Sequence, residues 1–138
     1  MATAKKAAAP AAAAVQGDDW STEELAEVRA ELEGQATSLR GEIDRAEVAS
    51  EKLKRDQSTE GSGDEADAGS KTFEREHEMS LANNARDMLL QVVHATQRIT
   101  NGTYGLCESC GNAIGKARLQ AFPRATLCLT CKQREERR

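Results

Sequence analysis

The sequence predicts a mainly α-helical protein, in which a long antiparallel two-helix coiled-coil hairpin is followed by a small cysteine-stapled module and a C-terminal helix. Two apolar stripes recur at helical spacing and are separated by a segment without large apolar side chains. All four cysteines lie within residues 107–131. Only 38% of the residues are hydrophobic and 3% aromatic, which is too little bulky apolar material for one large core.

The N-terminal residues 1–17 are rich in alanine and carry no periodic pattern, so we expect a disordered Ala/Lys/Pro tail. Alanine is too weakly apolar for the core of a signal peptide, and Pro10 interrupts this stretch. No apolar run in the sequence is long enough to cross a membrane. We therefore expect a cytoplasmic protein without a membrane segment, in which clustered thiols bind metal rather than form disulfides.

The first helix of the expected hairpin, which spans residues 18–103, has a clear start. Ser21 and Glu24 stand at the two positions of a capping box, and Trp20 and Leu25 at those of a hydrophobic staple. Apolar residues then follow at intervals of mostly three or four until about residue 55. The stripe comprises Leu25, Val28, Leu32, Ala36, Leu39, Ile43, Ala46 and Leu53.

Residues 56–70 contain three glycines and no large apolar side chain, which predicts a tip loop. A second stripe follows, and Asn101-Gly102 is a good C-terminal stop. Two stripes of similar length around one loop predict antiparallel packing of stripe on stripe. The second stripe comprises Phe73, His77, Leu81, Ala85, Met88, Val92, Ala95 and Ile99.

Neither histidine has cysteine or carboxylate neighbours at ligand spacing. We expect His77, which lies on the stripe, and His94, which lies off it, to be helix-packing residues rather than ligands.

The cysteines of the C-terminal module, residues 104–138, follow the pattern C-x2-C, seventeen residues, C-x2-C. Two residues between ligands let both thiolates of a pair reach one tetrahedral ion, so the spacing predicts a C4 zinc finger with one Zn²⁺. Four thiolates leave no open position for water, which predicts a structural ion. A redox switch is the competing interpretation. Gly111 supplies the tight turn of the first pair. The predicted ligands are Cys107, Cys110, Cys128 and Cys131.

The charge of the chain is divided along its length. Residues 18–60 carry thirteen acids and six bases, whereas residues 101–138 carry three acids and seven bases. A mostly acidic helical pair with a basic end favours docking on a protein partner over direct, specific binding of DNA. The sequence has no nucleophile–base pair, no phosphate-binding glycine loop and no open metal site, so we expect that the protein is not an enzyme. We also expect a monomer.

The stretch from Tyr104 to Lys132, YGLCESCGNAIGKARLQAFPRATLCLTCK, resembles the DksA/TraR family of bacterial transcription factors. The isoleucine, arginine and proline of the family pattern between the cysteine pairs match Ile114, Arg118 and Pro123 without a gap. The long members of the family carry an Asp-x-x-Asp-x-Ala motif at the hairpin tip. Asp64 and Asp67 match its aspartates, and Gly69 replaces its alanine.

The resemblance implies a regulator that binds RNA polymerase rather than DNA. In this family the hairpin enters the secondary channel of the polymerase and its acidic tip approaches the active site, while the zinc module and the C-terminal helix hold the channel rim. Binding changes the stability of promoter complexes. The resemblance therefore assigns Asp64 and Asp67 to the active-site tip, and Gly69 implies a looser tip than alanine would give.

Family members that respond to guanosine tetraphosphate hold its phosphates with basic residues on the second helix and the zinc module. The gapless alignment places the uncharged Asn84, Gln91 and Phe122 at three of these positions. Only Lys132 and the nearby Arg118 keep a positive charge for nucleotide or polymerase contacts. Because a multiply charged phosphate needs charge-assisted partners, we predict a weak or absent response to this nucleotide.

Two other functions stay open. A polymerase-channel factor that stimulates transcript cleavage could use adjacent tip acids such as Asp64 and Glu65 to hold a catalytic magnesium ion. A zinc-ribbon nucleic-acid binder would use bases of the module, although the sparse aromatic residues argue against stacking on bases. Those bases are Lys116, Arg118, Arg124 and the tail from Arg134 to Arg138.

Overall fold

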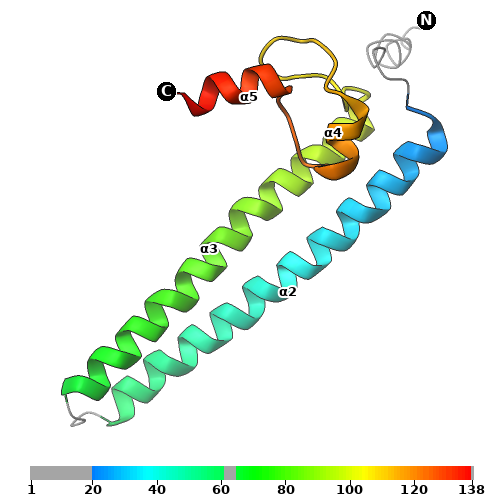
Figure 1. Ribbon diagram of the computed structural model, residues 1–138. Coiled ribbons are helices and arrows are strands. Elements are labelled where there is room, and N and C mark those ends of the chain that lie inside the picture. Colours follow the sequence, from blue (N-terminus) through cyan, green and yellow to red (C-terminus); the bar gives the residue numbers. More distant parts are fainter. Residues whose placement is uncertain (1–19, 61–64, 138) are drawn as a thin grey trace, which may run out of the picture. The chain divides into compact units, whose positions relative to one another are not determined.

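The computed structural model describes residues 20–60 and 65–137. Within these ranges the chain forms the helices α2 (Thr22–Glu60), α3 (Glu65–Asn101), α4 (Lys116–Ala121) and α5 (Leu129–Glu136), drawn in Figure 1. The described residues contain no strand, and an isolated antiparallel bridge joins Leu106 to Ala113. The predicted mainly α-helical hairpin, with a small module and a C-terminal helix after it, is confirmed. The tail predicted at residues 1–17 lies outside the described residues.

The described residues divide into two compact units. The hairpin unit spans residues 35–90, and the base unit combines residues 20–34 with residues 91–137. Helices α2 and α3 run antiparallel and contribute segments to both units (Figure 1). Among the described helices, none combines the length and the apolar character that crossing a membrane requires.

The start of α2 has the predicted capping box. The backbone N–H of Ser21 donates to Glu24 Oε1 at 2.9 Å, and the N–H of Glu24 donates to Ser21 Oγ at 3.0 Å. These two bonds satisfy backbone donors that the first helical turn leaves free. The ring of Trp20 packs edge-on against Tyr104, with ring centroids 5.5 Å apart, a contact that the staple pattern did not predict.

Small residues fill the seam between α2 and α3. On α2 the predicted stripe is confirmed, because its members Leu32, Ala36, Leu39 and Ala46 are all buried. On α3 the seam continues with alanines and one valine. Alanine side chains let two helices approach closely, so little apolar volume is needed to hold the pair. The buried residues of α3 are Ala82, Ala85, Val92 and Ala95, together with Arg98.

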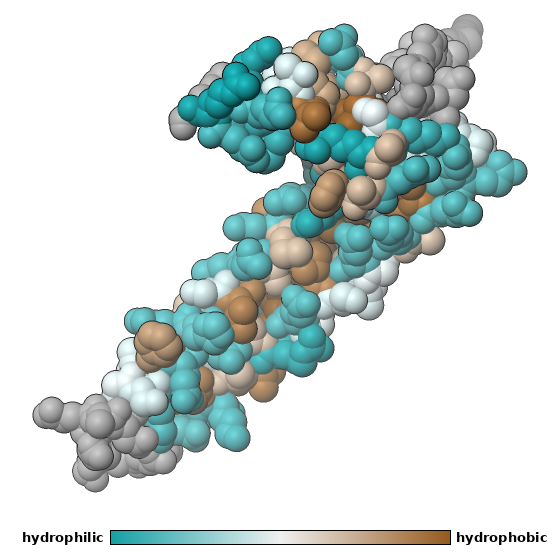
Figure 2. Space-filling view, viewed as in Figure 1, coloured by the Kyte–Doolittle hydropathy of each residue, from teal (hydrophilic) through white to brown (hydrophobic). Residues whose placement is uncertain are grey.

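The first half of the predicted α3 stripe is wrong. Phe73 is 73% exposed, Leu81 is 48% exposed and His77 is exposed, whereas Ala82 is buried. From Ala85 the buried face steps back by three residues to Ala82, whereas the predicted stripe steps back by four residues to Leu81. A shift of one residue turns a side chain by about 100° around the helix. Phe73, Met79 and Leu81 in the first half of α3 therefore lie outside the seam. Figure 2 shows separate hydrophobic patches among mostly hydrophilic residues.

The predicted tip loop, residues 56–70, is too long. Helix α2 continues to Glu60 and α3 begins at Glu65, so both ends of this segment are helical. The side-chain amide of Gln57 donates to the carbonyl oxygen of Ala68 at 3.1 Å and to Thr72 Oγ1 at 2.8 Å. Once a helix exists, each further residue adds a hydrogen bond, and the segment has no proline to stop it.

Candidate metal centre

The first cysteine pair lies in a tight backbone turn of the base unit. The N–H of Cys107 donates to the carbonyl oxygen of Asn112 at 2.8 Å, and the N–H of Gly111 donates to that of Cys107 at 3.0 Å. Gly111 has a φ of 79°, in the left-handed region that favours glycine. The predicted role of Gly111 is therefore confirmed, and the turn directs Cys107 and Cys110 to the same side.

The second cysteine pair is placed by α5. Cys128 is the N-cap residue of this helix and Cys131 lies in its first turn. The N–H of Lys132 donates to the carbonyl oxygen of Cys128 at 2.9 Å, which closes the turn around the pair. The N–H of Glu108 donates to the carbonyl oxygen of Thr126 at 2.8 Å. This last bond joins the segments that carry the two pairs.

The four sulfur atoms form one cluster. The Sγ atoms of Cys107, Cys110, Cys128 and Cys131 all lie within 4.8 Å of one another, and those of Cys110 and Cys128 are 3.9 Å apart. A tetrahedral zinc site with Zn–S bonds of about 2.3 Å has sulfur–sulfur edges of about 3.8 Å. The cluster therefore fits a single zinc ion. Cys107 and Cys131 are buried, Cys128 is half-buried and Cys110 is exposed.

The surroundings of Cys107 favour the thiolate, the form that binds metal. Burial raises the pKa of this thiol, but hydrogen bonds from the backbone of Cys128, Cys110 and Ser109 outweigh it and lower the pKa to about 6. The N–H of Ser109 lies 3.4 Å from Cys107 Sγ. The backbone of the module therefore stabilises negative charge on this sulfur.

A small apolar core supports the cysteine cluster. Ile114 and Leu119 are almost completely buried, and Tyr104 is 3% exposed. The Tyr104 hydroxyl group donates to the carbonyl oxygen of Pro123 at 3.0 Å. Arg118 Nε donates to the carbonyl oxygen of Leu127 at 3.1 Å. Ile114, Arg118 and Pro123, the residues between the cysteine pairs that matched the family pattern, thus have structural positions within the module.

Contacts within the base unit join this module to both long helices. Lys116 Nζ lies 2.7 Å from Glu24 Oε1 and 5.2 Å from the centre of the Trp20 ring. The hydrogen bond from Lys116 lowers the pKa of Glu24. The buried Arg98 of α3 donates to the carbonyl oxygens of Thr103 and Leu106. Sequence analysis missed these contacts, because no local pattern links residues as distant as Glu24 and Lys116.

His94 does not pack within the seam. Its ring is 46% exposed, and Nε2 lies 2.5 Å from Glu108 Oε2. Glu108 stands between the first two cysteines, so His94 contacts the first cysteine turn from α3. Neither histidine belongs to the metal cluster found among the described residues.

The structure does not bring the other predicted site residues into this cluster. Asp64 lies outside the described residues, and only the backbone of Asp67 is described, within α3. The guanidinium of Arg118 makes the bond to Leu127 given above. Lys132 Nζ lies 3.8 Å from Glu135 and 3.9 Å from Glu136, its neighbours on α5.

Comparisons with known proteins agree on one family. The model of the prokaryotic dksA/traR C4-type zinc finger matches residues 102–137. The chain is 38% identical over 80 residues to the RNA polymerase-binding transcription factor DksA of Caulobacter vibrioides, a match that spans 58% of this chain and 56% of that relative's length. An uncharacterised protein of Aquifex aeolicus is 30% identical over 101 residues, 68% of this chain and 70% of its own.

A solved structure extends the similarity to the hairpin. Transcription factor DksA2 of Pseudomonas aeruginosa superposes with a TM-score of 0.73 at 28% sequence identity, over 93% of this chain and 96% of the DksA2 chain. The C4 zinc-finger match and the sulfur cluster together identify a structural zinc site. When bound, the ion stabilises the module by tying its two cysteine pairs together.

Proposed function

Since the chain belongs to the DksA/TraR family, we propose that it regulates bacterial transcription by binding RNA polymerase through the secondary channel. The observation that carries the proposal is the pairing of a helical hairpin with a four-cysteine module, in a chain whose structure matches that of DksA2 over 93% of its length. The Caulobacter relative is named as an RNA polymerase-binding transcription factor. The proposed protein is a cytoplasmic monomer that acts without catalysing a reaction of its own.

The base unit and the hairpin unit would have different roles in binding polymerase. The zinc ion, bound by the thiolates of Cys107, Cys110, Cys128 and Cys131, keeps the base unit folded so that it can hold the rim of the channel. Asp64 and Asp67 would act at the polymerase active site from the hairpin tip. Acidic side chains at that place would change the stability of promoter complexes through their charge.

The first experiment is binding of the zinc-loaded full chain to purified bacterial core RNA polymerase, measured beside binding to duplex DNA alone. We expect saturable binding to the polymerase and none to DNA. Binding to DNA that weakens steeply with salt, together with no binding to polymerase, would instead favour the zinc-ribbon nucleic-acid binder. Cleavage of transcripts in stalled complexes would favour the cleavage factor.

The proposed response to guanosine tetraphosphate is weak or absent. Arg118 already donates a hydrogen bond within the module, and Lys132 lies near two acids. Gln91 accepts a hydrogen bond from Arg124 at 3.4 Å and has no charge to offer. We expect that adding the nucleotide to the protein–polymerase complex leaves the affinity of the protein for polymerase unchanged. A clear effect that is lost in Lys132→Ala would contradict this proposal.

A further inference from the structure

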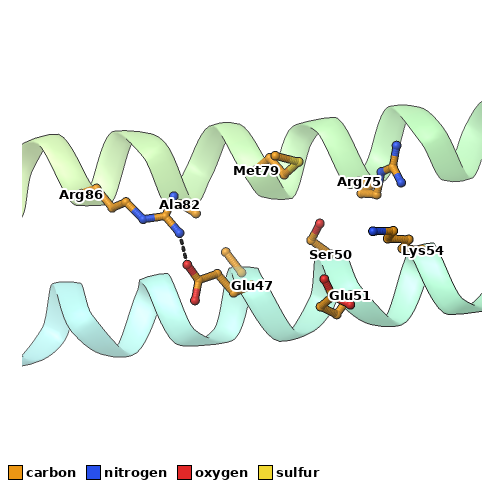
Figure 3. Close-up of a pocket in the computed structure, with 9 residues that line it drawn as sticks. Glu47, Ser50, Glu51, Lys54, Arg75, Met79, Ala82 and Arg86 are labelled. Atoms are coloured by element: carbon orange, nitrogen blue, oxygen red, sulfur yellow. Dashed lines mark hydrogen bonds and ion pairs between the residues drawn. The ribbon is translucent and has the colours of Figure 1, made fainter.

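A groove of about 430 Å³ lies between α2 and α3 in the hairpin unit. Figure 3 shows side chains from both helices directed toward it. The groove is open to solvent along one side, and none of its residues belongs to the metal centre. Its lining consists of Ala46, Glu47, Ser50, Glu51, Lys54, Arg75, Met79, Ala82 and Arg86.

Two small residues explain the hollow. Ala46 and Ala82 are 5% and 3% exposed, and neither side chain extends beyond Cβ to fill the space beside the seam. Met79, which is 51% exposed, contributes an apolar and adaptable wall. The middle of the groove can therefore cover a short hydrocarbon chain, whereas its ends are polar.

One end of the groove carries two cations, Lys54 from α2 and Arg75 from α3 (Figure 3). Arg75 Nε is buried and has no hydrogen-bond partner among the described residues. A buried donor without an acceptor is costly, and in native proteins it indicates a missing water, ion or ligand. If the Arg75 side chain turns so that Nε faces the groove, an oxyanion there would satisfy this donor and gain a second cation from Lys54.

The acids of the groove do not neutralise this end. Glu47 pairs with Arg86 at the opposite end, as the dashed line in Figure 3 marks. Glu51 also lines the groove, and Figure 3 marks no ion pair between it and Lys54 or Arg75. Three bases and two acids give the lining a net charge of +1, on a chain with a net charge of −4. This balance suits one negative charge better than a multiply charged phosphate.

We propose that the groove binds a small monocarboxylate, with the carboxylate between Arg75 and Lys54 and a short aliphatic chain against Ala46, Met79 and Ala82. The proposal rests on the hairpin unit alone and not on binding to polymerase. A carboxylate accepts from Arg75 Nε in the geometry that guanidinium–carboxylate pairs prefer. The apolar part of the ligand covers surface that water now contacts.

The test uses the full zinc-loaded chain labelled with ¹⁵N, hexanoate as the probe and hexan-1-ol as its uncharged counterpart. The Nε–Hε signal of Arg75 reports directly on the donor that the carboxylate would satisfy. We expect this signal to shift saturably with hexanoate and not with hexan-1-ol. Arg75→Gln should weaken binding by about tenfold or more, since a hydrogen bond to a charged group is lost.

Arg40→Gln is the matched control, because Arg40 is exposed on α2 and does not line the groove. It removes the same charge and should leave hexanoate binding unchanged. Lys54→Gln alters an exposed side chain that no seam contact requires, and it should weaken binding several-fold at unchanged helicity. This second variant keeps the test decisive if Arg75→Gln unfolds.

Three results would overturn the proposal. The first is a shift that grows linearly with hexanoate and never saturates. The second is an equal response to hexan-1-ol, which would show that the carboxylate plays no part. The third is binding that Lys54→Gln and a folded Arg75→Gln leave as strong as in the wild type, which would place the ligand elsewhere.

Discussion

Tyr104 is the only tyrosine of the chain, and it joins several parts of the base unit. Its ring contacts Trp20, and its hydroxyl group donates to the carbonyl oxygen of Pro123. Burial raises the pKa of Tyr104 to about 12, because the phenolate would lose its hydration there. A single residue thus reports whether the module is packed against the start of α2.

The ionisation of Tyr104 gives the first prediction. An absorbance titration of the phenolate should have its midpoint at about 12 in the folded protein and near the ordinary value of 10.0 in denaturant. The neutral form is favoured in the folded state, so its contribution to stability is complete below the unfolded pKa and is lost as the pH rises through the folded pKa. A native midpoint near the denatured one would show that Tyr104 is not buried.

At the scale of elements, the helix start at Ser21, the cysteine turns and the α2 stripe were predicted correctly, whereas the face of α3 in the seam and the length of the tip loop were not. The capping box at Ser21 and the cysteine spacing depend on residues within a few positions, where backbone geometry decides the outcome. The face of α3 that enters the seam depends on which positions oppose α2, and the helical spacing and hydrophobicity that placed Phe73 and Leu81 on the predicted stripe do not contain this information. The ion pair of Lys116 with Glu24 likewise needs the fold before it can be seen.

The seam assignment gives the second prediction, a comparison of neighbouring residues. Ala82→Asp should destabilise the protein by about 1–3 kcal/mol, because it places a polar, chargeable group at a position that is 3% exposed. Leu81→Ala should change stability by less than about 0.5 kcal/mol, since Leu81 is half exposed. Denaturant unfolding of both variants measures the difference. A larger loss of stability from the change at Leu81 than from the change at Ala82 would show that Leu81, as first predicted, lies in the seam.

The glycines give the third prediction. A Cβ atom built at Gly69 of α3 meets nothing within 4 Å, so Gly69→Ala should stabilise the protein by about 0.5–1 kcal/mol through helix propensity. Gly111→Ala is the opposite case, since the φ of 79° there strains any other residue. The denaturant midpoint of unfolding should rise for Gly69→Ala and fall for Gly111→Ala. Destabilisation by Gly69→Ala would mean that this turn is not helical in solution.

At the scale of the whole molecule, zinc binding determines whether the base unit is folded. Its module packs few large apolar residues, chiefly Tyr104, Ile114 and Leu119. A core of this size needs the free energy of metal binding in order to fold. The hairpin seam consists of helices whose hydrogen bonds are internal, so it depends less on the ion.

Zinc removal gives the fourth prediction. Chelation, or Cys131→Ser, should expose Trp20, the only tryptophan, and shift its fluorescence to longer wavelength. The pKa of Tyr104 should fall toward 10.0 at the same time, because burial of its ring is lost. Restoring zinc to the wild type should reverse both changes. Identical fluorescence and melting with and without zinc would contradict a structural role for the ion.

The central claim is that the hairpin tip acts on polymerase through its two aspartates. Its most direct test is the lifetime of promoter complexes with wild-type protein and with Asp64→Ala/Asp67→Ala. Asp44→Ala/Asp87→Ala, which removes the same charge from exposed positions of the hairpin unit, is the control. We predict that the wild type and the control shorten the lifetime, and that the tip variant binds polymerase but leaves the lifetime unchanged. A tip variant that shortens it as the wild type does would contradict the account.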